Sequence, residues 1–222
     1  MNHFEELKKA NPDKKFYSVL DPEFERYGHV IGFDTKEFSE IIREKMYLPE
    51  SGSRYVPTFL PIENTEKANE YNEVLCGQIP HQWGLCWGYN SKMTALEYHS
   101  SNEFNIAVTE LVLILGKRAD IGTDGRYDAN KCEFFYAPEG VMFECYADTL
   151  HYGPCMVTKD GFALVVGLPK FTNTDVDTRL RRAPLLTAKN KWLLAHESEE
   201  ELIKDGAKGL VYGPNHVVRT VE

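Results

Sequence analysis

The chain has 222 residues, of which 42% are hydrophobic and 12% aromatic, and its formal net charge at pH 7 is -9. This length fits one large all-β domain with additional elements, and the aromatic content excludes an intrinsically disordered chain. The negative charge argues against nucleic acid or an anionic membrane as a partner, because phosphate binding requires clustered Lys and Arg.

The N-terminal residues and the cysteine spacing both bear on where the protein is located in the cell. The first residues carry no charged-then-apolar signal pattern, and no stretch approaches the ~20 apolar residues of a membrane span. The five cysteines form no CxxC pair, which favours reduced, buried thiols over a zinc-thiolate site. We therefore expect a cytoplasmic protein with no membrane segment.

Residues 1–77 carry helix signals. An N-cap at Asp34-Thr35 precedes an apolar stripe with spacings of three and four, formed by Phe38, Ile41, Ile42 and Met46. A second helix is expected to begin at Thr65 and to stop before Gly77. We therefore expect helical N-terminal elements ahead of the main fold.

From residue 78 to residue 170 the pattern changes to short apolar runs bounded by Gly, Pro, Asp or Asn, at 111–115, 134–136, 141–143 and 162–166. Several short strands without intervening helical patterns indicate a sandwich or barrel. Residues 171–222 are more polar and contain a short strand at 191–194 and an acidic helix at 198–205. We predict one mainly β domain over 1–222, with its barrel core at 78–170 and a C-terminal extension at 171–222 packing on it.

A cluster of acids and histidines lies in residues 95–106. In a strand Glu97 and His99 point to the same side, and a turn then leads to Glu103 on the next strand. The cluster serves either mutual hydrogen bonding or ligation of a divalent metal. Two inward carboxylates repel each other unless a cation neutralises them, which favours the metal.

A second polar segment follows at residues 134–154. Its turn at 147–149 places His151 at the start of another strand, where it becomes the fourth candidate metal ligand. Glu144 lies within an apolar strand and faces either solvent or the metal, and in the second case it is a candidate catalytic acid or base. Tyr146 shares its strand face and is a candidate substrate-binding residue.

Three further polar residues are candidates for substrate binding. Asn105 follows Glu103 by two residues, hence on the same strand face, where it can contact a substrate hydroxyl or satisfy a ligand. Gln82 precedes a strand that could line the mouth of the barrel. Lys170 ends an apolar strand, where it can contact a carboxylate or phosphate; an ordinary surface lysine is the competing interpretation.

The motifs around these residues resemble those of the cupin superfamily. Its first motif runs H-x-H, three or four residues, then E; here it is Glu97-x-His99-x3-Glu103, with an acid in place of the first histidine. Its second motif centres on P-x-G-x-x-H and is similar to 148–151, with Asp148 at the glycine position. The resemblance implies a double-stranded β-helix, or jelly-roll barrel, and a divalent ion such as Zn, Mn, Ni or Fe.

Narrower resemblances concern two enzyme families. Ureidoglycolate lyases, a cupin family, have a similar E-x-H motif and a second motif similar to 140–154, with asparagine where this chain has Glu144. YhcH-type sugar anomerases, also barrel proteins, share an E-x-H motif. The whole chain looks most like an uncharacterised bacterial family known only as a domain of unknown function.

The resulting hypothesis is a metal-dependent enzyme acting on a small sugar or sugar-acid-like metabolite, by isomerase, epimerase or lyase chemistry. The alternatives are a ureidoglycolate-lyase-like activity and a non-catalytic barrel that binds small molecules. By analogy with other barrels, which bury exposed sheet edges by pairing, we expect a homodimer.

Overall fold

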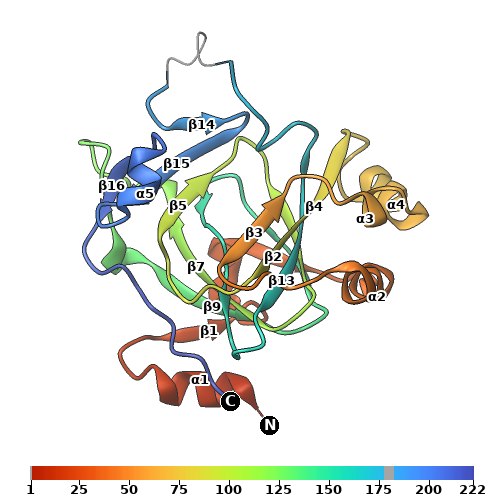
Figure 1. The fold of residues 1–222 in the computed structure, drawn as a ribbon, viewed down its shortest axis with the longest axis horizontal. Coiled ribbons are helices and arrows are strands. Elements are labelled where there is room, and N and C mark those ends of the chain that lie inside the picture. Colours follow the sequence, from red (N-terminus) through yellow and green to blue (C-terminus); the bar gives the residue numbers. More distant parts are fainter. Residues whose placement is uncertain (1, 178–182) are drawn as a thin grey trace.

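The computed structural model of the protein describes residues 2–177 and 183–222, and its strands form three sheets (Figure 1). The first sheet has the order β1-β9-β7-β11, with β12 also paired to β7; its strands are Phe16–Ser18 (β1), Glu133–Ala137 (β9), Leu111–Lys117 (β7), Thr149–Leu150 (β11) and Cys155–Met156 (β12). The second has the order β2-β10-β6-β13-β4-β3, from Gly28–Ile31 (β2), Met142–Cys145 (β10), Glu103–Ala107 (β6), Phe162–Pro169 (β13), His81–Gly88 (β4) and Ser53–Val56 (β3). The third has the order β14-β15-β16-β8, with β5 paired to β15, from Leu186–Ala188 (β14), Lys191–His196 (β15), Lys208–Tyr212 (β16), Tyr127–Asp128 (β8) and Ala95–Tyr98 (β5).

The first two sheets enclose a shared apolar core. Alternate residues of each strand point to opposite faces, so Leu113 of β7 and Phe135 of β9 meet Phe143 of β10 and Leu164 of β13 between the sheets. The intervening Ile114 packs instead in a second cluster on the outside of the first sheet. The protein is therefore a mainly β barrel of the cupin type, as the sequence predicts.

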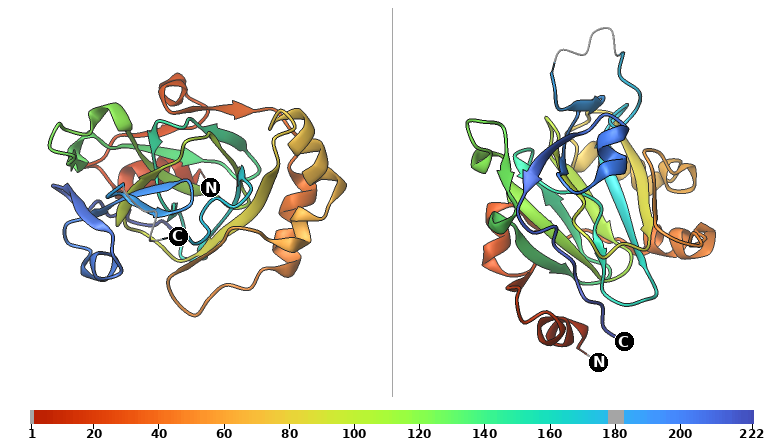
Figure 2. Two further views of the ribbon diagram at one scale, coloured as in Figure 1. Left: turned by 90° about the horizontal axis from the view of Figure 1, so that it is seen from above. Right: turned by 60° about the vertical axis from the view of Figure 1, so that its left-hand side comes forward.

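The α-helices of the described residues lie outside this barrel, α5 beside the third sheet (Figure 1); they are His3–Ala10 (α1), Lys36–Lys45 (α2), Leu60–Glu63 (α3), Glu66–Val74 (α4) and Glu200–Lys204 (α5). Helices α2, α3 and α4 lie together on one side of the barrel (Figure 2). Phe38 of α2 and Tyr71 of α4 are fully buried there against Trp83 of β4. None of the helices in 2–177 and 183–222 has the length and apolar character that crossing a membrane requires.

The N-terminal region contains strands as well as the helices that its sequence pattern predicts. Helices α2 and α4 occur where expected, and the Thr65 side chain caps α4 by accepting a hydrogen bond from the Ala68 backbone N–H at 3.1 Å. The same region also supplies β1, β2 and β3, which pair with β9, β10 and β4. Residues 1–77 therefore contribute strands to both barrel sheets.

The C-terminal extension packs against the strand that carries Glu97. Strand β15 pairs antiparallel with β5, and Leu193 lies opposite Glu97 in this register. A two-residue turn at Lys189-Asn190 connects β14 to β15, and Asn190 has a φ of 56°. This pairing brings the turn to one end of the barrel, beside the candidate site.

Candidate metal centre

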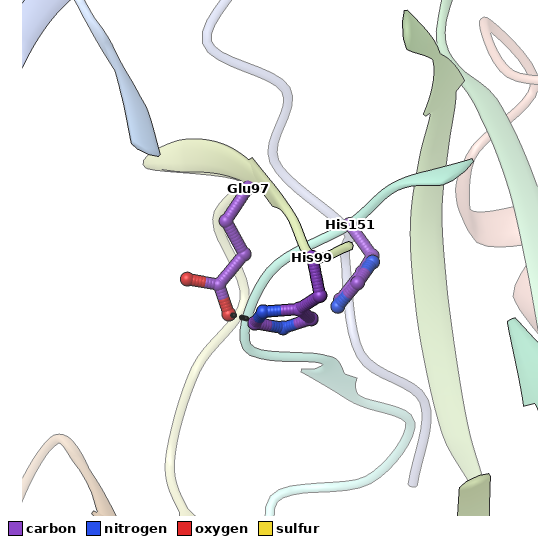
Figure 3. Close-up of side chains that lie close together, drawn as sticks. All are labelled: Glu97, His99 and His151. Atoms are coloured by element: carbon purple, nitrogen blue, oxygen red, sulfur yellow. Dashed lines mark ion pairs between the residues drawn. The ribbon is translucent and has the colours of Figure 1, made fainter. Parts of the chain in front are cut away.

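Two histidines and a glutamate converge at one end of the barrel. Glu97 is the third residue of β5, His99 follows that strand, and His151 follows β11. The Glu97 N–H donates to the His151 carbonyl at 2.6 Å, and the His151 N–H donates to the Glu97 carbonyl at 3.0 Å. This backbone pairing places the side chains together (Figure 3), with one ligand atom of each residue within 4.8 Å of the other two.

Glu103 joins this group from the inward face of β6. Its Oε2 atom lies 3.3 Å from His99 Nε2 and 3.4 Å from His151 Nε2. All four predicted ligands are buried. The structure therefore brings together Glu97, His99, Glu103 and His151, although Glu103 is outside the set of three ligand atoms that all lie within 4.8 Å of one another.

Both imidazoles have their second nitrogen fixed by the backbone. His99 Nδ1 donates to the Asn190 carbonyl at 2.6 Å, and His151 Nδ1 donates to the Thr149 carbonyl at 2.9 Å. A carbonyl oxygen can only accept, so in each neutral ring the lone pair is on Nε2. Both Nε2 atoms are buried and make no hydrogen bond within the described residues. Metal-ligating histidines typically have this arrangement, so the donor set fits a divalent ion.

The same proximity shifts the pKa values of the cluster. Burial lowers the pKa of His151, but the Glu103 and Glu97 carboxylates and the Thr149 carbonyl together outweigh burial and raise the pKa to about 9. Burial raises the pKa of Glu103, but the imidazoles of His151 and His99 outweigh it and hold that pKa well below its usual range. The metal-free cluster therefore favours an ionised Glu103, which is the form that ligates a metal, and a protonated His151, which must release its proton to ligate one.

A cavity of about 210 Å³ opens onto the cluster. It is lined by residues of the barrel, of the loop after β11 and of the C-terminal extension, namely Ser53, Tyr55, Cys86, Glu97, Glu103, His151, Tyr152, Gly153, Pro154, Leu164, Val166, Asn173 and Lys191. Only a small ligand fits beside the acids and histidines.

Sequence reasoning missed Lys191 at this site. Its ammonium lies 2.5 Å from Glu97 Oε2 and 5.4 Å from the centre of the Tyr152 ring. Burial lowers the pKa of Lys191, but Glu97, Tyr152 and Glu103 together outweigh burial and leave the pKa above its ordinary value. The pattern at 191–194 predicts the strand correctly, but no local signal shows that its first residue reaches Glu97.

Asn190 was also missed, and it connects the C-terminal turn to the metal cluster. Besides the backbone carbonyl that orients His99, its side-chain oxygen accepts from the N–H of Ser100 at 2.8 Å. Its Nδ2 donates to Thr172 Oγ1 at 3.0 Å and to Ser101 Oγ at 3.3 Å. Asparagine tolerates the left-handed backbone conformation better than most residues, so one residue supplies both the turn and the anchor.

We expect Asn190→Ala to weaken metal binding about 10- to 100-fold, because the carbonyl that orients His99 loses its side-chain anchors. Competition with a chromogenic chelator measures the affinity. Asn190→Gly keeps the left-handed backbone conformation but lacks the side-chain hydrogen bonds. If Asn190→Gly and Asn190→Ala lose the same metal affinity, the loss is due to those hydrogen bonds. Asn130→Ala, on an exposed turn, is the matched control. Wild-type affinity in Asn190→Ala contradicts the positioning role.

Glu144 does not face the site, so of the two orientations that its sequence left open the outward one is adopted, and its candidate role as a catalytic acid or base is wrong. In the register of β10 with β6, Cys145 lies opposite Glu103 and Glu144 lies opposite Phe104. Glu144 is therefore on the outer face of the sheet, where its carboxylate lies 3.0 Å from His29 Nδ1. Strand alternation allows both orientations, and the apolar neighbours Phe143 and Cys145 occupy the inner face.

Because Glu144 lies outside the cavity, we expect Glu144→Gln to leave metal stoichiometry and affinity unchanged within about twofold, the scatter of neutral surface changes. Inductively coupled plasma mass spectrometry and chelator competition on the purified variant measure both quantities. Loss of bound metal in Glu144→Gln contradicts the placement of this residue.

The candidate substrate-binding residues occupy different places. Asn105 lies on the inward face of β6, opposite Phe143 and Val166, and is buried beside Glu103. Gln82 donates to the Thr172 carbonyl and accepts from the Phe171 N–H, so it fixes the loop after β13.

Tyr146 and Lys170 lie away from the cavity lining. Tyr146 packs beside His29 with ring centres 6.1 Å apart, on the same side of the sheet as Glu144. Lys170 is half exposed and lies 3.6 Å from Glu63. Of the four predicted substrate-binding residues, Asn105 is the one that shares a strand face with a candidate metal ligand, Glu103.

The fold and the site together define a cupin-type β barrel with a possible metal centre of one glutamate and two histidines. The chain belongs to the family described as a domain of unknown function (DUF4867), which matches residues 16–215. No curated protein matches the chain.

Several solved structures of other proteins are similar at low identity. The non-heme alpha-ketoglutarate-dependent epimerase SnoN from nogalamycin biosynthesis is 9% identical, with a TM-score of 0.38 over 83% of this chain and 93% of its own. Acireductone dioxygenase from Bacillus anthracis, with a cadmium ion in its active centre, is 11% identical, with a TM-score of 0.32 over 62% of this chain and 86% of its own.

A mutant of Bacillus subtilis oxalate decarboxylase is 10% identical, with a TM-score of 0.33 over 58% of this chain and 28% of its own. This protein therefore spans less than half of the oxalate decarboxylase chains that it matches, between 24% and 45% of their length. These likenesses are too distant to indicate a reaction. The narrower resemblances to ureidoglycolate lyases and sugar anomerases stay predictions.

Proposed function

We propose that this protein is a metal-dependent enzyme that acts on a small sugar or sugar-acid-like metabolite by isomerase, epimerase or lyase chemistry. The observation that carries the proposal is the pair of buried His99 and His151 Nε2 atoms, which lack a hydrogen bond and lie beside two buried glutamates. Imidazole and carboxylate ligands suit Mn, Fe, Zn and Ni.

The cavity supports a small polar substrate at this centre. A divalent ion held by Glu97, His99, Glu103 and His151 supplies Lewis-acid polarisation of a carbonyl or hydroxyl oxygen when it is bound. The polar wall beside it includes Tyr55, whose hydroxyl accepts a hydrogen bond from Asn173 Nδ2 at 3.0 Å. These groups suit a compound with several oxygens.

With Glu144 outside the cavity, proton transfer falls to other residues of its lining. Desolvation raises the pKa of the Tyr55 and Tyr152 phenols, so both keep their proton at neutral pH and can donate it only to a strongly basic oxygen such as a developing alkoxide. Lys191, also in the lining, is charged at neutral pH as an ordinary lysine is, and its surroundings raise its pKa further. We propose these three groups as the candidates for moving a proton next to the substrate carbonyl.

The test is conversion of a panel of aldoses, ketoses, sugar acids, 2-oxo acids and ureido acids by protein loaded with Mn, Zn, Ni or Fe(II), followed by NMR. We expect turnover of one compound class that requires metal and is lost in His151→Ala. Tyr55→Phe and Tyr152→Phe then separate proton transfer from metal binding, since neither removes a ligand. Metal-loaded protein that binds these compounds and converts none contradicts the proposal and favours a non-catalytic binding barrel.

Two further proposals concern the assembly and the compartment. We propose a cytoplasmic homodimer, which follows from the cysteine pattern and from analogy with barrels that pair their sheet edges. Sedimentation velocity of the purified chain tests the oligomeric state.

A further inference from the structure

Lys191 is the one Lys or Arg side chain among the described residues that line the cavity. It begins β15 and extends between Glu97 and the Tyr152 ring, with 19% of its side chain exposed. Burying most of a long cationic side chain costs conformational entropy and solvation, which a purely structural position could avoid with an apolar residue. The position therefore points to a ligand-directed role.

The hydrogen-bonding capacity of this ammonium exceeds what the protein supplies. An ammonium carries three N–H donors, and within 2–177 and 183–222 its one ion-pair partner is Glu97. The Tyr152 ring contributes only an electrostatic contact with its face. Lys191 therefore has donors to offer to a molecule in the cavity.

The charge balance of the cavity depends on the metal. Glu97 and Glu103 carry two negative charges, and a divalent ion between them neutralises both when the histidines are neutral ligands. Lys191 still lies beside Glu97, but its positive charge is then the one charge of the described lining residues that is left unbalanced in the sum. The metal-loaded cavity carries about one net positive charge, which favours an anionic ligand.

We propose that Lys191 binds a carboxylate of the substrate beside the metal, so that the substrate is a sugar acid or a small hydroxy acid instead of a neutral sugar. A carboxylate carries one negative charge and balances the cavity, whereas a phosphate monoester carries nearly two at pH 7. This inference rests on the proposed function, because the charge that it assigns to the cavity includes the metal ion.

The test compares two pairs of compounds that differ only in a carboxylate, D-glucuronate with D-glucose and D-glycerate with glycerol. Isothermal titration calorimetry measures their binding to wild type, Lys191→Gln and Lys170→Gln, each loaded with Mn. Lys170 is the matched control, because its half-exposed ammonium lies near Glu63 and outside the cavity lining. Mass spectrometry of bound metal accompanies each titration.

We expect wild type and Lys170→Gln to bind at least one acid on the order of tenfold more tightly than its neutral partner, as a charge-assisted hydrogen bond provides. Lys191→Gln is expected to lose this preference while it retains one metal ion per chain. Equal binding within both pairs, absence of acid binding, or an unchanged preference in Lys191→Gln overturns the inference. Wild-type protein without bound metal overturns the proposed function as well, so the two failures are distinguishable.

Discussion

His151→Ala and His99→Ala are each expected to reduce the affinity for a divalent ion by more than about 100-fold, because loss of a ligand exceeds the 10- to 100-fold cost of losing an outer-shell contact. Each substitution removes an Nε2 atom that the backbone holds beside Glu103. Chelator competition on metal-loaded protein measures the affinity.

His216→Ala is the matched control for these variants. Its Nε2 donates to the Ala129 carbonyl at 2.9 Å, and its ring packs edge-on against Phe134, outside the cavity lining. We expect metal affinity in this variant to stay at the wild-type level. If His151→Ala lowers stability but binds metal as wild type does, the cluster is a hydrogen-bonded structural group and the metal interpretation is wrong.

Phe135→Ala is expected to lower the free energy of unfolding by about 3–5 kcal/mol, the usual cost of removing a fully buried phenylalanine. Phe135 is completely buried between the two barrel sheets and contacts the rings of Tyr17, Phe24 and Tyr27. The cavity left by the substitution is bounded by these three aromatic rings, and the movement of one of them does not fill it. Urea unfolding followed by tryptophan fluorescence measures the change.

Tyr47→Ala provides the comparison for this stability measurement, because its side chain is among the most exposed large apolar groups, at 84%. We expect a change within about 0.5 kcal/mol there. A loss of less than about 1 kcal/mol in Phe135→Ala means that the space between the sheets is not the main core, contrary to the barrel architecture.

The barrel strands were predictable because their apolar runs are short and their boundaries carry turn residues. The runs at 111–115 and 162–166 both occur within longer strands, β7 and β13. The capped helix after Thr65 was predictable for the same local reason. Strands β1 to β3 were not, since each is only three or four residues long and depends on its partner for stability.

The metal cluster could be predicted only in part. The alternation of side chains along one strand can be read from the sequence, whereas the register between strands cannot. Glu97 and His99 are two residues apart, so their shared direction follows from the strand itself. For Glu144, alternation along the strand leaves two orientations, and only the register of β10 with β6 decides between them.

The contribution of the C-terminal extension required the three-dimensional structure. Asn190 and Lys191 are more than ninety residues from Glu97 along the chain, and the antiparallel pairing of β15 with β5 brings them together. Neither the polar composition of 171–222 nor its short strand pattern specifies that partner. Contacts of this kind depend on tertiary packing, which a single sequence does not display.

The most direct measurement is the metal content of the purified protein, by inductively coupled plasma mass spectrometry, for wild type and for the double variant His99→Ala/His151→Ala. We predict close to one divalent transition-metal ion per chain in wild type after metal loading and dialysis, and on the order of a hundredth of that in the double variant. Equal metal content in the two proteins, or none in loaded wild type, contradicts the metal centre at Glu97, His99, Glu103 and His151.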